Sequence, residues 1–350
     1  MVHGGGIQKM ADQIAAPNNK KQELQLSDIA KALQLSTSTV SRAISGKGRI
    51  GDDTRRRVLD YIDACDYRPN SIARSLAKSC TYNLCVAMPK DSYQSELPFF
   101  QSALMGVCEQ ANASDYDVLV ACVDNNDVSA LKRMLTNKKV DGVILTRTQT
   151  EDPTLEYLKA SGAPFVLIGS STDAKVPCID VDNRAASRAL CAYMLRKGYK
   201  RFALFLGRCD NTVNAARREG LLDALRAACV PDERILKIDG LTGRQQIQQA
   251  LTRARAAACD CILCGDDYIA NRLLSAAERV GAKQIHVASC YHSVLLESCR
   301  PRIPAVEIDA HAMGKLAAQS LLLQIQERVK GEKRMTESYR ILDESGSPIA

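Results

Sequence analysis

The sequence predicts two kinds of structure in one chain: an all-α helix-turn-helix head, followed by a two-lobed α/β core of parallel, doubly wound sheets. Short amphipathic helices fill residues 25–68, whereas apolar strands and amphipathic helices alternate from residue 81 onward. The chain has 350 residues, and single cores usually stop growing near ~250–300 residues. Several domains are therefore expected.

The composition is that of a globular protein. Hydrophobic residues make up 46% of the chain and charged residues 25%, with no apolar run long enough to cross a membrane. The first residues, "MVHGGGIQKMADQIAAPNNKK", lack the apolar region of a secretory signal. We therefore expect a cytoplasmic protein with a flexible tail over residues 1–24.

Two short segments of the head have apolar residues at helical spacing. They predict helices over about 28–34 and 37–45, with Ser27 capping the first and Ser36 or Thr37 capping the second. The turn of three to four residues between them is typical of a helix-turn-helix. A third helix is expected within "DDTRRRVLDYIDACDY", residues 52–67, which would complete a small core.

The second helix of the head carries hydroxyls and a cation on one side. Thr37, Ser38 and Arg42 are expected on the face away from Val40 and Ile44. Hydroxyls bind phosphates or base edges, and an arginine fork matches the guanine edge in the major groove. The alternative is a solvated helix whose hydroxyls only cap. Residues 25–80 contain ten Lys/Arg against six Asp, an excess of four in a chain of net charge +7, which is compatible with nucleic-acid binding.

From residue 26 to residue 79 the sequence resembles the DNA-binding head of the LacI/GalR family of bacterial transcription regulators. The motifs that carry the resemblance are D-I-A, S-T-V-S-R, G-K-G-R-I, T-R-R-R-V and Y-R-P-N-S-I-A-R-S-L. The resemblance implies that Thr37, Ser38 and Arg42 read bases, while phosphates are held by Ser36, Ser41, Lys47 and Arg49. It also implies a hinge helix over 69–80 with Asn70, Arg74 and Leu76. Leu76 would wedge into the minor groove, or alternatively pack on its own domain.

Apolar strands mark the core. We expect them at 82–88, 117–123, 141–146, 164–169, 201–207, 234–239, 260–264 and 285–289. The irregular segment 170–183 follows four strands and indicates a crossing between lobes. The family resemblance, carried here by stretches such as "KKVDGVILT" and "ARREGLLDAL", implies a core built like a periplasmic sugar-binding protein, with three crossovers. The expected lobes span 81–180 with 309–330, and 181–308 with 331–350.

Ligands of open α/β sheets bind at the carboxyl ends of the strands. The candidates at these ends are Phe99, Phe100, Arg147, Asn211, Arg217, Asp266, Asp267 and Tyr291. In the family, an arginine three residues before a helix glycine often binds the effector, and here Arg217 precedes Gly220. The alternative is that Arg217 is a surface residue of a basic helix.

The resemblance implies a sugar-type effector, but the sequence departs from the family pattern. Cys290 stands where an aspartate commonly ends a strand, Gly169 and Ser170 replace a frequent Asp-Arg pair, and the chain contains no tryptophan. With Arg147 and Arg217 present, an anionic effector such as a sugar acid or sugar phosphate is the alternative to a neutral sugar.

Other functions are less well supported by the sequence. "CDCILC", with Cys259, Cys261 and Cys264, suggests a metal or redox site by spacing but is better explained as a buried strand. No phosphate-binding glycine motif is present, the four histidines lack metal-ligand spacing, and His286 is expected in the core. We expect no enzyme, no cofactor and no metal. A periplasmic sugar-binding protein would need a signal peptide and no head.

Two heads that read a palindromic operator require two-fold symmetry, so a homodimer is expected. The C-terminal segment "ERVKGEKRMTESYRILDESGSPIA" predicts a helix end and a short strand, without a leucine heptad extension that would build a tetramer.

Overall fold

A computed structural model describes residues 25–45, 49–65, 80–90, 97–124, 127–281, 285–327 and 334–349. The chain divides into two compact units, residues 1–80 and 81–350, which are described separately. The tail predicted over 1–24 and the hinge helix predicted over 69–80, except its last residue, lie outside the described residues.

The head consists of three helices around a small apolar core. They are α2 (Leu26–Leu33), α3 (Thr37–Ser45) and α4 (Asp52–Ala64). Their buried side chains are Ile29, Ala30, Val40, Ala43, Val58 and Ile62. Each helix is too short to be stable alone in water, so packing of these apolar faces must hold the head together.

The turn between α2 and α3 depends on a left-handed residue. Gln34 has φ 56° and ends α2, and the next amide, that of Leu35, donates to the carbonyl of Ala30 at 2.8 Å. The predicted cap of α2 was wrong: the helix begins at Leu26, Ser27 lies inside it, and the Asp28 carboxylate accepts from the backbone of Gln25 at 3.0 Å. An acidic group in the first turn satisfies helix amides as a capping serine would.

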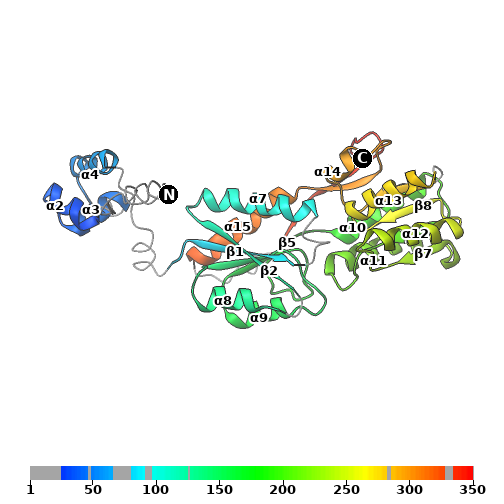
Figure 1. Cartoon of the computed structure of the whole chain (residues 1–350), viewed down its shortest axis with the longest axis horizontal. Helices are drawn as coiled ribbons and strands as arrows, with labels where there is room; N and C mark the ends of the chain where they lie inside the picture. Colours follow the sequence, from blue (N-terminus) through cyan, green and yellow to red (C-terminus); the bar gives the residue numbers. More distant parts are fainter. Residues whose placement is uncertain are drawn as a thin grey trace, which may run out of the picture. The chain divides into compact units, whose positions relative to one another are not determined.

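The first lobe is a six-stranded sheet of order β11-β5-β4-β3-β1-β2, and all of its strand pairs are parallel. Its elements are β1 (Asn83–Pro89), α7 (Pro98–Asn112), β2 (Asp117–Val123), α8 (Ser129–Thr136), β3 (Gly142–Leu145), α9 (Pro153–Ser161), β4 (Phe165–Ile168), β5 (Cys178–Val181), α15 (Ala310–Glu327) and β11 (Arg334–Glu337). Figure 1 shows α7 and α15 on one side of this sheet and α8 and α9 on the other.

The second lobe repeats this plan, with strand order β12-β10-β9-β8-β6-β7, and only β12 runs antiparallel to its neighbour. Its elements are α10 (Asn183–Arg196), β6 (Phe202–Phe205), α11 (Thr212–Ala227), the short 3-10 helix Asp232–Arg234, β7 (Ile235–Ile238), α12 (Arg244–Ala256), β8 (Cys261–Cys264), α13 (Asp267–Arg279), β9 (His286–Ser289), α14 (Val294–Glu297), β10 (Ala305–Ile308) and β12 (Tyr339–Leu342). Helix α10 packs on α11, and α12 packs on α13.

The chain crosses between the two sheets three times: after β5, after β10, and between β11 and β12. Residues 334–337, assigned to the second lobe from the sequence, form β11 of the first sheet beside β5. This edge strand alternates exposed and half-buried residues and has no apolar run, so its sequence carries little information about which sheet it joins.

Glycines permit a close helix contact in each lobe. A Cβ on Gly106 of α7 would lie 2.0 Å from the carbonyl oxygen of His311 in α15, and one on Gly314 of α15 equally close to that of Ala103. In the second lobe, a Cβ on Gly220 of α11 would lie 2.1 Å from the carbonyl oxygen of Arg184 in α10. Only glycine permits such close backbone contact, and at Gly220 this contact brings α11 against the N-terminal end of α10.

Candidate functional site

Helix α3 of the head is anchored by its apolar face and capped by a serine. The Ser36 hydroxyl accepts from the backbone N–H of Thr39 at 3.1 Å, which caps the helix as expected for one of the two predicted residues. It also lies 2.8 Å from the hydroxyl of Ser38. Val40 and Ala43 are buried, which fixes the orientation of the helix.

Four polar residues of α3 lie on its outer surface. Thr37, Ser38, Ser41 and Arg42 are all exposed. Arg49, in the segment before α4, is exposed as well. Lys47, Asn70, Arg74 and Leu76, which were also predicted to contact DNA, lie outside the described residues. The described part of the head thus has a hydroxyl-rich helix face with an arginine on it.

The core contains a cavity lined by residues of both lobes, with about 700 Å³ of empty space counted up to its mouth. All eight effector candidates predicted from the strand ends line it: Phe99, Phe100, Arg147, Asn211, Arg217, Asp266, Asp267 and Tyr291. Other lining residues were not predicted from the sequence, namely Leu97, Thr146, Ile168, Gly169, Asp180, Val181, Asn183, Val213, Asn214, Ile308 and Met313.

Arg217 is buried in the wall of this cavity and is held at two points. Its Nε donates to Asn183 Oδ1 at 3.1 Å, and one terminal guanidinium nitrogen donates to the carbonyl oxygen of Gly265 at 2.8 Å. The guanidinium carbon lies 6.0 Å from the ring centre of Tyr291. The surface position considered for Arg217 was therefore wrong, because only 8% of the residue is exposed.

Asp266 and Asp267 stand at the start of α13. The Asp266 carboxylate caps the helix by accepting from the Ile269 N–H at 2.9 Å. Asp267 is fully buried and accepts from the Ser293 hydroxyl and from the backbone N–H of Tyr268. Burial, reinforced by the neighbouring Asp266 carboxylate, raises the pKa of Asp267 to about 6.

Asp180 is the last polar residue of β5 and faces the same cavity. Its Oδ1 accepts from the Asn183 amide at 3.0 Å and from its neighbouring backbone N–H at 2.8 Å. Burial raises its pKa to about 6, while the backbone hydrogen bond and the Arg217 charge act in the opposite direction. Asn183 thus connects Asp180 to Arg217, since its amide donates to the carboxylate and its oxygen accepts from the guanidinium.

Aromatic rings form an apolar part of the lining. Phe99 makes edge-to-face contacts with Phe100 and with Tyr291, at centroid distances of 5.5 and 5.7 Å. Phe99 and Phe100 begin α7 in the first lobe, whereas Tyr291 follows β9 in the second, so this contact joins the lobes. A mixed lining of rings, carboxylates and amides suits a ligand with an apolar face and several hydroxyls.

Hydrogen bonds between the lobes lie beside the cavity. Thr148 and Thr212 bring their hydroxyl oxygens within 2.9 Å of each other, and the Thr150 N–H donates to the carbonyl oxygen of Asp210 at 2.9 Å. Gln149 and Asn211 form an isolated antiparallel bridge. Asn211 also caps α11 by accepting from the Val213 and Asn214 amides, so a cavity residue lies within this interlobe contact.

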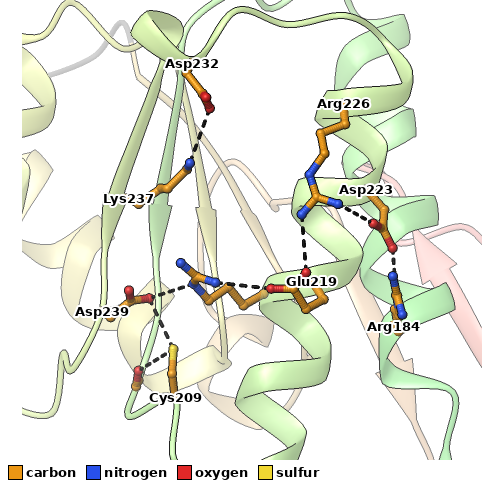
Figure 2. Close-up of polar contacts among 10 residues, drawn as sticks. Arg184, Cys209, Glu219, Asp223, Arg226, Asp232, Lys237 and Asp239 are labelled. Carbon is orange, nitrogen blue, oxygen red and sulfur yellow. Dashed lines mark hydrogen bonds and ion pairs between the residues drawn. The ribbon is translucent and has the colours of Figure 1, made fainter.

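Ion pairs hold the outer side of α11 (Figure 2). Asp223 pairs with Arg184 of α10 at 2.7 Å and with Arg226 at 2.9 Å, and Arg226 also reaches Glu219 at 3.3 Å. Exposed pairs of this kind contribute little individually, about 0–1 kcal/mol. Of these three pairs, Arg184–Asp223 joins the two helices, and it supplements the close contact at Gly220 in keeping α11 on α10, and hence Arg217 beside Asn183.

Two further expectations concern residues outside the cavity. Cys261 and Cys264 of β8 are buried, and burial raises the pKa of both thiols, so core packing explains "CDCILC". The expectation for His286 was wrong, because it is exposed at the start of β9 and packs against the Tyr199 ring at a centroid distance of 4.6 Å. In the described residues no helix is long and apolar enough to span a membrane.

Fold and site together define a class of protein, a two-lobed ligand-binding core preceded by a helix-turn-helix head. Residues 25–70 match the family model described as "Bacterial regulatory proteins, lacI family". Residues 81–296 match the model described as "Periplasmic binding proteins and sugar binding domain of LacI family". The chain belongs to the LacI family of bacterial regulatory proteins. Membership of this family agrees with the expectation that the protein is not an enzyme.

Individual relatives share about a third of their residues or fewer with this chain over the matched regions. The HTH-type transcriptional regulator MalR of Streptococcus pneumoniae is 34% identical over 206 residues, which are 57% of this chain and 62% of MalR. The HTH-type transcriptional regulator AglR of Rhizobium meliloti is 30% identical over 263 residues, 73% of each chain. Among solved structures, the lac repressor dimer bound to operator and the anti-inducer ONPF matches with a TM-score of 0.76 at 18% identity, covering 91% of this chain and 98% of that one. That likeness shows the fold.

Proposed function

We propose that the protein is a cytoplasmic, homodimeric repressor of carbohydrate-utilisation genes, whose binding to a palindromic DNA operator is controlled by a sugar in the interlobe cavity. The observation that carries the proposal is the presence, in one chain, of a match to the lacI regulatory head and a match to the family's sugar-binding domain. A protein so built can convert binding of a small molecule into a change of DNA affinity.

The residues proposed to contact DNA are those of the exposed face of α3 and its surroundings. Thr37, Ser38 and Arg42 read bases, whereas Ser36, Ser41, Lys47 and Arg49 hold phosphates. Asn70, Arg74 and Leu76 of the hinge contact the minor groove. Support comes from the exposure of Thr37, Ser38 and Arg42 on a helix that is fixed by its buried face. Of the three base readers, Arg42 has the only side chain that forms a bidentate fork with guanine, so it contributes most of the direct discrimination.

The proposed dimer follows from the DNA. A palindromic operator presents two equivalent half-sites, and a two-fold symmetric pair of heads reads both at once. One solved structure with the same fold, the lac repressor, is described as a dimer bound to operator.

We propose a neutral, polyhydroxylated effector, held by the eight predicted lining residues together with Asp180 and Asn183. Three carboxylates line the cavity, those of Asp180, Asp266 and Asp267, against the two guanidiniums of Arg147 and Arg217. Carboxylates accept hydrogen bonds from sugar hydroxyls but repel phosphate and carboxylate groups. The charge balance therefore favours a neutral sugar over the anionic effector that Arg147 and Arg217 alone suggested. The ring of Phe99 is available to pack on the apolar face of a pyranose.

Two measurements test this function. Selection of DNA from a random library by the full-length protein should enrich a palindrome, and a gel-shift assay should show the dimer on it at moderate salt. A thermal-shift screen of neutral sugars, with sugar acids and sugar phosphates as the comparison set, should then give stabilisation by a neutral member. Absence of any enriched palindrome would remove the regulator function, and stabilisation only by anions would remove the neutral effector.

A further inference from the structure

A second hollow lies on the second lobe, and it shares no lining residue with the interlobe cavity. It contains about 410 Å³ of empty space between α12 and α13. Its lining consists of Arg244 and Gln248 from α12, Arg272, Ser275, Ala276 and Arg279 from α13, and Val280 just after α13. We name this hollow the arginine pocket.

The positions of these arginines along α12 and α13 bring their side chains together. Arg244 and Gln248 are four residues apart on α12, and Arg272, Ala276 and Arg279 recur at intervals of four and three on α13. Side chains at such spacings share one face of a helix. Two packed helices therefore direct long hydrogen-bond donors into the same groove.

The lining of the arginine pocket is strongly cationic. None of the lining residues is acidic, and among the described residues no ion pair is found for Arg244, Arg272 or Arg279. By contrast, arginines on the outer side of α11, including Arg226, are paired with carboxylates (Figure 2). Three like charges in one hollow repel each other, so the arginine pocket favours an anion from outside.

Two local features strengthen this interpretation. Arg244 is the first residue of α12, where the positive end of the helix dipole disfavours a cation, and the first turn of α12 contains no acidic residue. The Gly243 N–H at this end of α12 already donates to Gln246 Oε1 at 3.0 Å, so the contribution of the helix to anion binding is its dipole and the guanidiniums supply the hydrogen bonds. Arg272 lies over the ring of Tyr268 at 5.1 Å, a cation–π contact that orders its guanidinium before any ligand binds.

We propose that the arginine pocket binds a phosphate group as a dianion, at a second ligand site separate from the interlobe cavity. Guanidinium forks match the oxygens of a phosphate in pairs, and three of them suit a doubly charged tetrahedral group. Inorganic phosphate and a phosphate monoester of a small metabolite share this chemistry. The site does not depend on the proposed sugar in the cavity or on DNA.

Calorimetric titration of the full chain at low ionic strength tests the site with inorganic phosphate as the probe. The variants are Arg244→Gln, Arg272→Gln and Arg279→Gln, and the matched control is Arg253→Gln, an exposed arginine of α12 outside the lining. We expect saturable binding by the unmodified chain, about tenfold weaker binding in each lining variant, and less than about twofold change in the control. All four positions are exposed, so the variants should fold, and circular dichroism checks that they do.

A second titration with glucose 6-phosphate and with glucose separates the two sources of phosphate. Tighter binding of the ester than of inorganic phosphate, lost in Arg244→Gln, identifies an organic phosphate as the ligand. Weaker binding of the ester identifies inorganic phosphate, equal binding shows that only the phosphate group is recognised, and each of these results supports the site. No saturable phosphate binding, or an equal loss of affinity in Arg253→Gln, would overturn it. Neither result bears on DNA binding or on the interlobe cavity, so failure here is distinct from failure of the proposed function.

Discussion

Replacement of Asp267 by asparagine should make the protein more stable at neutral pH while weakening its binding of sugar. Asp267 is fully buried, and its pKa rises from 3.8 to about 6 because the ionised carboxylate has lost its hydration beside Asp266. At 1.36 kcal/mol for each tenfold change in acid dissociation, this rise corresponds to about 3 kcal/mol. Asparagine keeps the shape and can accept from the Tyr268 N–H while donating to Ser293.

The raised pKa determines whether the stability of the folded protein rises or falls with pH. A carboxyl with a raised pKa binds its proton more tightly in the folded protein than in the unfolded chain, so stability falls as pH rises from about 4 through 6. Well below pH 3.8 the carboxyl is protonated in both states, and the asparagine variant should match the unmodified protein. Above pH 7 the variant should be more stable by up to about 3 kcal/mol, with a shallower pH profile.

Urea unfolding of the full chain between pH 4 and pH 8, followed by circular dichroism, measures this difference. Asp232→Asn is the matched control, since Asp232 is an exposed carboxylate 3.3 Å from Lys237, and we expect a change below about 1 kcal/mol. A lower stability of Asp267→Asn than of the unmodified protein at pH 7.5 would show that burial of this charge does not cost stability. An unchanged dependence of the unfolding free energy on pH would show the same.

Two further predictions concern the head and the helix contact beneath Arg217. Arg42→Ala should cost about 1–3 kcal/mol of binding free energy for the selected palindrome and leave the affinity for random DNA nearly unchanged. Competition gel shifts measure both affinities, with Arg56→Ala of α4 as the control. Equal losses of affinity on both DNAs would contradict a base-reading role. Gly220→Ala should destabilise the core by about 2 kcal/mol or more, because its Cβ would lie 2.1 Å from the Arg184 carbonyl oxygen. Urea unfolding would show this against Gly243→Ala, whose Cβ lies 3.7 Å from the nearest atom, and similar losses in the two variants would argue against the close helix contact.

The eight strands predicted from the sequence correspond to strands of the structure because each is rich in apolar residues. Inner strands such as β3 and β8 are fully buried, whereas the edge strands β2 and β7 are partly exposed. Strands β5 and β10 were missed: each has four residues, one of them acidic, and neither stands out from a loop by composition. They can be recognised as strands only from their pairing with neighbouring strands in the folded sheet. The position of β11 likewise depends on pairing with β5 and not on its own residues.

The same limits explain which cavity residues were predicted. The rule that ligands bind at strand ends located Arg147 and Asp267 because the preceding strands were recognised. Asp180 and Asn183 were missed because they lie in and just after β5, which was not recognised. The burial of Arg217 depends on the contact at Gly220, where α11 approaches α10, and helix periodicity alone does not fix that approach.

In the proposed function, binding of a sugar in the interlobe cavity and binding of DNA to the head are energetically coupled. The most direct test is the affinity of the full chain for its selected palindrome, titrated with the sugar found by thermal shift, in the unmodified protein, Arg217→Gln and Phe99→Ala. We expect the sugar to change DNA affinity about tenfold or more in the unmodified protein, and both variants to bind DNA normally without sugar but to lose this response. A sugar that binds while DNA affinity stays constant, or variants that respond like the unmodified protein, would contradict this coupling.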